Sequence, residues 1–396
     1  MKDILDEGLL RPERCHSWPR VDRAFWLEAA RDAVSRVRAN MGCFGLGFYP
    51  APASSGQVYE AIPNTEWTSS FWPGMLWLAG EMTGDTAFSA RALAMIPDFR
   101  RRLDERIEVE THDLGFLYTL SCVSAWRCTG NAAAREAALK AADMLMERYY
   151  ESAGIIQAWG NLSDPAQRGR IIIDCVMNLP LLFWTSEQTG DPRYRNAAVR
   201  HLEVANEHLL REDGSSYHTY HFDIENGSGL RGSTAQGSSD SSCWARGQAW
   251  GILGLSLCFR YLHDPSLLEL AAKLAHYFLN RTPEDWVCYW DLSFTEGGEE
   301  KDSSAAAIAA CGLLELASHL AVADPRRRQY ENAAASMAAS LARGYAVEEW
   351  MPGKGLLQHG VYSKPEGRGV DESCVWGDYF YLELLARLLI PWSPYW

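Results

Sequence analysis

The chain has 396 residues, 47% of them hydrophobic, and a formal net charge of −14 at pH 7. This length and composition are sufficient for a substantial core in one large domain or two ordinary ones. An acidic surface gains nothing from contact with a phosphate backbone or with anionic lipid, so we expect neither nucleic acid nor a membrane as a partner.

Ten cysteines are scattered along the chain without a CxxC pair. This usage is typical of buried, reduced thiols. The start, MKDILDEGLLRPER, lacks a basic leader followed by an apolar segment, and no later run reaches about 18 uninterrupted apolar residues. We therefore expect a cytoplasmic protein.

In chain order, the first predicted element is an amphipathic helix over residues 21–39, and a repeated pattern follows it. Five times, an apolar helical run leads to a short polar mark and then to an amphipathic run. The marks are TGD at 83–85, TGN at 129–131, TGD at 189–191, HDP at 263–265 and ADP at 323–325. Glycine can end a helix in the left-handed conformation, Asp or Asn can cap the next helix, and Pro fits its first turn. The marks predict five helical hairpins.

The helix before each mark differs from the helix after it. The preceding runs, such as IIIDCVMNLPLLFWTSEQ, are apolar on most faces, whereas the following runs, such as AAAREAALKAADMLMERYY, carry one apolar stripe. The helix at 21–39 is of the outer type and the final run VWGDYFYLELLARLLI is of the inner type, so the two ends complete a sixth pair.

The sequence therefore predicts an all-α fold, an (α/α)6 barrel of six helical hairpins with long rim loops. We expect it to fill residues 1–396 as a single catalytic domain. Strand signals are confined to long segments between the helix pairs, such as 151–173 and 212–243, which are candidates for a substrate-binding rim.

Polar residues collect at the predicted starts of the inner helices. Every inner helix enters the ring in the same direction, so the six N-termini share one end of the barrel. Asp113 and Asp174 belong to consecutive inner helices, and we expect both near this common mouth. Each carboxylate could cap a helix. Alternatively, the pair could do acid–base chemistry, for which sugar-cleaving sites use paired carboxylates.

Sixteen tryptophans are far above ordinary usage. Those predicted at or near the mouth are Trp67, Trp72, Trp159, Trp244, Trp250 and Trp376. Tryptophan faces bind the C–H surfaces of sugar rings. Trp77, Trp126 and Trp184 lie deeper in the helices or at their far ends, where core packing is the expected role.

Arg246 is the natural cationic anchor for a substrate carboxylate, because guanidinium binds carboxylate in a bidentate manner. The alternative is a salt bridge to a rim carboxylate such as Asp240. Both interpretations place the guanidinium at the mouth of the barrel.

The histidines divide into two groups. His112, His218 and His221 cluster in the rim loops and helix starts, whereas His263, His276 and His319 occupy hairpin or outer positions with expected structural roles. The HxxH pattern at 218 and 221 lacks a clear third ligand, so we expect no metal site and no cofactor.

Five blocks of the sequence, in order, resemble the unsaturated glucuronyl hydrolases, family 88 of the glycoside hydrolases. They are NTEWTSSFWPGMLWLAGEMTGD, HDLGFLYTLS, IIIDCVMNLPLLFWTSEQTGD, LRGSTAQGSSDSSCWARGQAWGILG and GRGVDESCVWGDYFYLE. Several such blocks in series are highly specific, although any one would not be. The resemblance implies an (α/α)6 barrel that removes a 4,5-unsaturated uronic acid from the non-reducing end of oligosaccharides left by polysaccharide lyases.

The resemblance also implies residue roles. Asp174 would be the general acid and base, and Asp113 its essential companion. The sugar pocket would be formed by Trp67, His112, Trp159, His218, Gln236, Trp244, Arg246 and Trp250.

Two departures from the family pattern concern substrate contacts. Relatives commonly have His immediately before the matching glutamine, where this chain has Ala235. Members favouring sulfated glycosaminoglycan fragments resemble one another in an S-x-x-S-x-K motif. Here SKPEGR supplies Ser363 and Arg368 as substrate-binding residues but places Glu366 at the second serine. The carboxylate should repel sulfate, whereas Arg368 could offset it.

The implied reaction is hydration of the C4=C5 enol ether. Asp174 would give a proton to C4, and the resulting carboxylate would take one from a water adding to C5. The hemiketal then opens and expels the rest of the saccharide. Burial beside 171–173 and repulsion from an ionised Asp113 are both expected to keep Asp174 protonated near neutral pH.

Three other functions stay open. An unsaturated rhamnogalacturonyl hydrolase would share the barrel and the hydration chemistry but act on pectin fragments. A sugar epimerase or isomerase would use histidines for proton transfer, and a carbohydrate-binding protein would bind the disaccharide without consuming its alkene. The expected partner is an unsaturated oligosaccharide, and the expected assembly is a monomer or a weak homo-oligomer.

Overall fold

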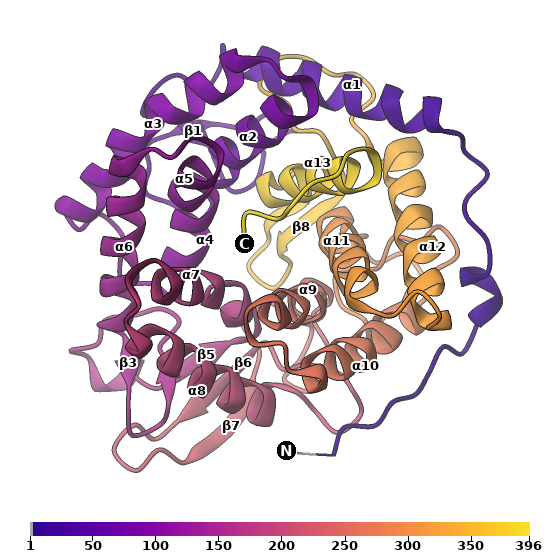
Figure 1. Ribbon diagram of the computed structural model, residues 1–396. Helices are drawn as coiled ribbons and strands as arrows, with labels where there is room; N and C mark the ends of the chain where they lie inside the picture. The colour runs from indigo at the N-terminus through magenta and orange to yellow at the C-terminus, as the bar shows by residue number, and fades with distance from the viewer. Residues whose placement is uncertain (1–2) are drawn as a thin grey trace.

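A computed structural model describes residues 3–396, whose helices form two concentric rings (Figure 1). The inner ring consists of α2 (Phe71–Thr83), α4 (Leu114–Tyr118) continuing through the π-helical turn η2 (Thr119–Val123) into α5 (Ser124–Thr129), α7 (Leu179–Thr189), α9 (Ala245–Leu262), α11 (Ser303–His319) and α13 (Val375–Leu389). The outer ring consists of α1 (Arg23–Asn40), α3 (Thr86–Asp104), α6 (Ala132–Met146), α8 (Pro192–Leu209), α10 (Pro265–Arg281) and α12 (Pro325–Ser340).

The inner ring is closed. Consecutive inner helices contact one another, and α13 contacts α2. From Ala245 to Cys258 every residue of α9 is buried, whereas α8 buries one stripe and exposes the rest. This difference in burial follows the predicted inner and outer types, and the predicted (α/α)6 barrel is confirmed.

The polar marks form the links inside the hairpins, largely as the sequence predicts. Gly84 ends α2 with a φ of 72°, and the Asp85 side chain accepts a hydrogen bond from the first turn of α3. The HDP mark uses no glycine, because His263 itself adopts the left-handed conformation with a φ of 54°. The ADP mark differs further, since α11 already ends at His319 and Ala323 lies in the link.

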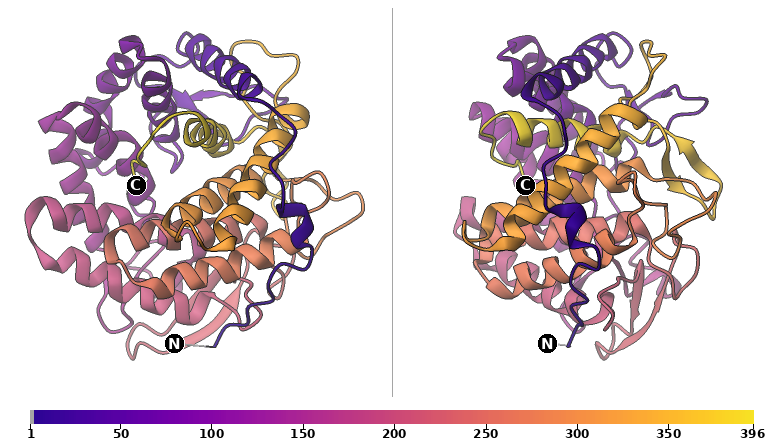
Figure 2. Two further views of the ribbon diagram at one scale, coloured as in Figure 1. Left: turned by 45° about the vertical axis from the view of Figure 1, so that its right-hand side comes forward. Right: turned by 90° about the vertical axis from the view of Figure 1, so that its right-hand side faces the viewer.

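The segments between hairpins carry the strands at one end of the barrel, as the right-hand view of Figure 2 shows. In the largest sheet, β6 (Thr219–Phe222) lies between β5 (Arg170–Ile172) and β7 (Gly229–Ser233), and all pairs are antiparallel. A hairpin joins β8 (Gly360–Ser363) to β9 (Arg368–Glu372). The shorter elements are β1 (Tyr49–Pro50), β2 (Ala61–Ile62), β3 (Tyr149–Tyr150), β4 (Ile155–Ile156), η1 (Pro12–Cys15), η3 (Pro165–Gln167), η4 (Ile173–Met177) and η5 (Leu341–Tyr345).

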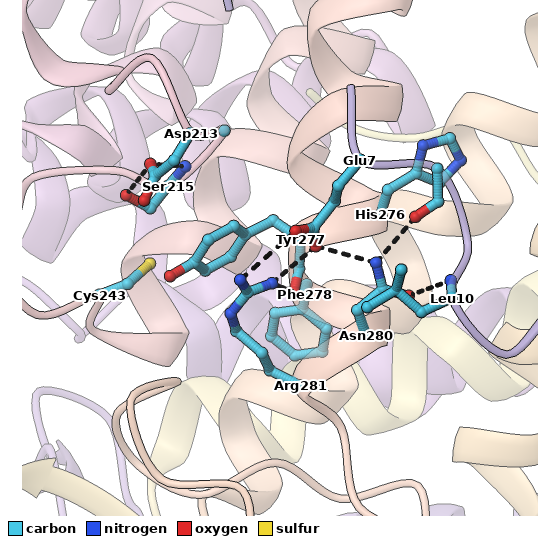
Figure 3. A network of polar contacts seen from close by, with 12 residues as sticks. Glu7, Leu10, Asp213, Ser215, Cys243, His276, Tyr277, Phe278, Asn280 and Arg281 are labelled. Carbon is cyan, nitrogen blue, oxygen red and sulfur yellow. Dashed lines mark hydrogen bonds and ion pairs between the residues drawn. The ribbon is translucent and has the colours of Figure 1, made fainter. Parts of the chain in front are cut away.

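The segment before α1 runs along the outside of the barrel and is tied to α10 (Figure 3). The Glu7 carboxylate accepts a hydrogen bond from the Arg281 guanidinium at 2.6 Å, and the Leu10 amide donates to Asn280 Oδ1 at 2.8 Å. The segment thereby spans the outer face between α10 and α1. Within residues 3–396, no helix has both the length and the apolar character needed to cross a bilayer.

Candidate active site

A pocket opens at the end of the barrel where the inner helices begin. Its walls come from helix starts, from β5 and from the β8–β9 hairpin. The lining residues are Trp67, Asp113, Trp159, Ile172, Asp174, His218, Ala235, Gln236, Trp244, Arg246, Trp250, Tyr362, Glu366 and Arg368.

Most of the residues predicted for the site therefore meet in one pocket. His112 and Ser363 do not line it: His112 lies behind the two aspartates, and Ser363 is a buried β8 residue that pairs with Arg368 across the hairpin. Sequence reasoning missed Ile172 and Tyr362. The Tyr362 hydroxyl accepts a hydrogen bond from Trp67 Nε1 at 3.0 Å, an interaction between distant segments that no local pattern signals.

Asp113 and Asp174 lie on either side of His112. The His112 Nε2 atom is 3.5 Å from Asp113 Oδ1 and 3.3 Å from Asp174 Oδ1. His112 is 1% exposed and directly precedes Asp113, the N-cap residue of α4, so it is buried at the helix start. A backbone hydrogen bond fixes the position of His112, because the His112 amide donates to the Ala158 carbonyl at 2.7 Å.

Neither aspartate caps a helix. Asp113 occupies the N-cap position of α4 without a side-chain capping bond, and its Oδ2 instead accepts from the Thr111 hydroxyl at 2.7 Å. Asp174 lies in the 3-10 turn η4, ahead of α7, and its buried Oδ1 makes no hydrogen bond. A buried carboxylate oxygen without a donor costs free energy, which favours a chemical role over a capping role.

Electrostatics couple these three groups. Burial raises the pKa of Asp113, and repulsion by Asp174 adds to it against the opposing attraction of His112. Burial disfavours the charge on His112, but Asp113 and Asp174 outweigh it and raise its pKa. The raised pKa of Asp113 conflicts with the expectation of a simply ionised companion. A proton in such a cluster belongs to the group as a whole.

His218 faces the pocket as a neutral ring. Burial lowers the pKa of His218 to about 4, assisted by Arg246 and opposed by Asp174. Its Nδ1 lies 2.6 Å from the Thr219 hydroxyl, while its buried Nε2 has no hydrogen-bond partner. His218 can therefore offer one ring nitrogen to a bound polar group.

Arg246 is part of the pocket wall, with its guanidinium 4.4 Å from the Trp244 ring centroid and 4.6 Å from that of Trp376. It donates to Gln236 Oε1 at 2.6 Å and to the Tyr362 carbonyl at 2.7 Å. The predicted alternative, a salt bridge to a rim carboxylate, is found with Asp302 and not with Asp240.

The carboxylate that compensates Arg246 is Asp302. Its Oδ2 lies 3.8 Å from the guanidinium, and Asp302 is fully buried. The Arg246 Nε is buried without a hydrogen-bond partner, whereas the two terminal nitrogens donate to Gln236 and to the Val361 and Tyr362 carbonyls. The role of anchor for a substrate carboxylate remains a prediction.

The tryptophans divide between pocket and core. Trp67 stacks on Trp376 at 5.3 Å between ring centroids, and Trp376 in turn donates to the Ser304 hydroxyl at 2.8 Å. Trp72, predicted near the mouth, is buried against Phe44 and does not line the pocket.

Two groups of residues contain potential metal ligands. His221 does not join His218 in the pocket, and its Nε2 instead lies 2.9 Å from the Ser233 hydroxyl. His112, Asp113 and Asp174 each offer one ligand atom within 4.8 Å of the others. These are ligand types that a divalent ion accepts, and they are also the groups that a proton relay needs.

An (α/α)6 barrel with buried carboxylates beneath a tryptophan-lined mouth is the structure of a glycosidase. The profile described as Glycosyl Hydrolase Family 88 matches residues 52–368. The chain belongs to this family.

Individual members of the family are similar to this chain along its whole length. The chain is 47% identical over 397 residues to the unsaturated chondroitin disaccharide hydrolase of Streptococcus pyogenes serotype M1, covering 100% of this chain and 99% of the relative. A crystal structure of the unsaturated glucuronyl hydrolase of Streptococcus agalactiae is similar with a TM-score of 0.97, 44% identity and full coverage of both chains. A mutant of that enzyme complexed with dGlcA-GalNAc6S is similar with a TM-score of 0.90, 42% identity and full coverage of both chains.

Proposed function

We propose that this glycosidase removes a 4,5-unsaturated uronic acid from the non-reducing end of lyase-generated oligosaccharides by hydrating the C4=C5 enol ether. The observation that carries the proposal is the position of His112, 3.3 Å from Asp174 and 3.5 Å from Asp113 at the base of the pocket. The similarity to unsaturated glucuronyl and chondroitin disaccharide hydrolases supports the substrate class.

Asp174 is the proposed general acid and base. It lines the pocket, and its Oδ1 is not occupied by a hydrogen bond within the protein. Protonation of C4 leaves positive charge shared between C5 and the ring oxygen, and the new carboxylate then takes a proton from the water that adds to C5. The hemiketal opens and releases the remaining saccharide. Acid–base assistance of this kind contributes roughly 100- to 10,000-fold.

Asp113 and His112 are the proposed companions of Asp174. Burial and repulsion by Asp174 raise the pKa of Asp113, which favours retention of a proton within the cluster. His112 between the carboxylates stabilises negative charge when Asp174 has given its proton away. This arrangement supports an aspartate-based proton transfer over the epimerase alternative, in which histidines would act alone.

The proposed pocket binds the sugar by stacking and by a few polar contacts. Trp67, Trp159, Trp244 and Trp250 supply the apolar surfaces. His218, Gln236 and Arg246 supply the polar contacts, with Arg246 proposed to face the uronate carboxylate.

The rim of the pocket supports a preference for unsulfated substrates. Glu366 and Arg368 both line it, and Arg368 lies 3.9 Å from Glu66 and 4.3 Å from the Tyr362 ring centroid. Arg368, the cation proposed to accept a sulfate, therefore has the Glu66 carboxylate beside it and shares the pocket lining with Glu366. We expect Glu366→Ser to raise kcat/KM for a 6-sulfated disaccharide relative to its unsulfated form by about 1.4- to fivefold, because an exposed charge interaction contributes roughly 0.2–1 kcal/mol. Glu366→Gln is the matched control for charge alone, and an unchanged ratio in both variants would contradict this preference.

Three further parts of the proposal concern the whole chain. We take residues 1–396 as one catalytic barrel domain. We propose that it acts as a monomer or a weak homo-oligomer, and light scattering at assay concentration tests this assembly state. Ten free cysteines are typical of a reducing compartment, and they support a cytoplasmic location.

The test is loss of the alkene's ultraviolet absorbance across a panel of lyase products. Glycosaminoglycan-derived unsaturated disaccharides should be consumed, and a pectin-derived unsaturated disaccharide should react much more slowly. Faster loss of the pectin product would favour the rhamnogalacturonyl alternative, and tight binding without loss of absorbance would favour a binding protein. Repeating the assay after dialysis against a chelator distinguishes a proton relay from a metal site. A proton relay keeps its rate, whereas a metal site loses activity.

A further inference from the structure

Asn178 connects the two segments that carry the catalytic aspartates. It follows η4, which carries Asp174, and it is 2% exposed. Asn178 occupies the N-cap position of α7, but its side chain does not cap that helix. The Asn178 Oδ1 instead accepts a hydrogen bond from the Phe116 amide of α4 at 2.8 Å. This bond links neighbouring inner helices at their starts.

Gly115 lets the two segments approach this closely. A Cβ atom at position 115 would lie 2.3 Å from the Asn178 Cα and 2.4 Å from its Oδ1. Both distances are far inside van der Waals contact, and one of the atoms met is backbone. The glycine therefore serves close packing, and any side chain here would push Asn178 away from α4.

The amide group of Asn178 also contacts the backbone of Asp174. Its Nδ2 donates to the Asp174 carbonyl at 3.4 Å. Although burial dominates and raises the pKa of Asp113, hydrogen bonds from Thr111 and Asn178 act in the opposite direction and lower it. Nothing in the capping or periodicity patterns of the sequence points to this residue, because its partners lie on another helix.

We propose that Asn178, packed on Gly115, is a positioning residue that fixes the segment bearing Asp113 against the segment bearing Asp174. The inference rests on the proposed function, since it assigns the spacing of the two carboxylates to this contact. A displacement of about 1 Å in such a site can cost about 100-fold in rate.

The test compares Asn178→Ala with Asn332→Ala. Asn332 is also a buried asparagine, on the outer helix α12, where its Nδ2 donates to the Cys15 carbonyl at 2.9 Å. We expect Asn178→Ala to lower kcat about 100-fold with little change in KM. Its pH–rate profile should move to higher pH, because Asn178 opposes the rise in the Asp113 pKa and its removal raises that pKa further. Asn332→Ala should lose stability while keeping kcat and the profile.

Two more variants distinguish loss of the positioning contact from a folding defect. Gly115→Ala should reproduce the kcat loss of Asn178→Ala through the clash. Asn178→Asp keeps an acceptor for the Phe116 amide but loses the donor, and it should fold and show the shifted profile. Wild-type kcat and profile in these variants would overturn the proposal, and so would a rate loss that follows the melting temperature alone.

Failure of this inference and failure of the proposed function give different results. A wild-type enzyme that does not consume the alkene counts against the function. In that case, a crystal structure of Asn178→Ala tests the positioning role independently of activity. Distances from His112 to the two aspartates that match the wild-type values would overturn it, and a changed distance would support it.

Discussion

The His112 ring lies 3.3 Å from the Asp174 carboxylate, at the base of the pocket. Neither ring nitrogen makes a hydrogen bond that meets normal geometry, and neither does Asp174 Oδ1. Buried polar atoms are rarely left in this state. These unpaired atoms support the proposed role of the cluster in proton transfer.

Asp174→Asn should keep the fold and lose turnover. Asparagine fills the same space but cannot donate a proton to carbon, so we expect the rate of alkene loss to fall roughly 100- to 10,000-fold. Circular dichroism and thermal unfolding of the variant check the fold. Residual activity above about a hundredth of wild type would contradict the general-acid role.

Trp159→Ala should weaken substrate binding more than it slows chemistry. Trp159 lines the pocket, and the Arg170 guanidinium lies 4.9 Å from its ring centroid on the side of β5. Loss of one stacking surface worth about 0.5–1.5 kcal/mol predicts a KM increase of about three- to tenfold. The control is Trp126→Ala, a partly buried tryptophan of α5 outside the pocket, which should leave KM unchanged.

Asp378 makes the stability of the protein sensitive to pH. Burial raises the pKa of Asp378 to about 7 from an ordinary 3.8, against hydrogen bonds from the Leu357 and Leu356 amides and the Tyr59 hydroxyl. A carboxyl with a raised pKa in the folded state favours folding below the unfolded pKa, and this contribution is lost as pH rises through the folded pKa.

The corresponding variant is Asp378→Asn, which keeps an acceptor for both amides and offers a donor to Tyr59. We expect it to be more stable than wild type at pH 8, with the difference disappearing near pH 4. Thermal unfolding across this range measures both limits. A constant difference at all pH values would show that Asp378 does not titrate as described.

The far end of the barrel holds a buried ion-pair cluster that stabilises the fold. Arg387 of α13 lies 2.7 Å from Glu315 of α11 and 2.8 Å from Glu383. Arg387→Met removes the cation beside the buried Glu383, whereas Glu315 keeps Arg260 at 3.0 Å, and loss of a buried partner of this kind costs about 3–5 kcal/mol. Denaturant unfolding should show this loss, while KM of the folded fraction should stay at the wild-type value because the cluster is remote from the pocket.

The fold could be read from the sequence because its signals are local. Each mark combines a helix end, a cap and a helix start, as Gly84 and Asp85 illustrate. The difference between the inner and outer types follows from how many helix faces are apolar. Once six inner helices enter the ring in one direction, their starts must meet, and this brings Asp113 and Asp174 together.

What the sequence could not provide are the contacts between distant segments. Asp302 and Arg246 belong to neighbouring inner helices, and sequence proximity wrongly favoured Asp240. The place of His112 behind the aspartates depends on the backbone bond to Ala158, and the role of Asn178 depends on Phe116. Periodicity indicates which face of a helix is buried but not which atoms of other segments that face contacts.

The most direct test of the central claim is proton NMR of the reaction in D2O. Hydration predicts that the C4 alkene signal disappears in step with release of the remaining saccharide, and that early product carries solvent deuterium at C4 in one configuration set by Asp174. Release of the saccharide while the alkene signal persists would contradict the account.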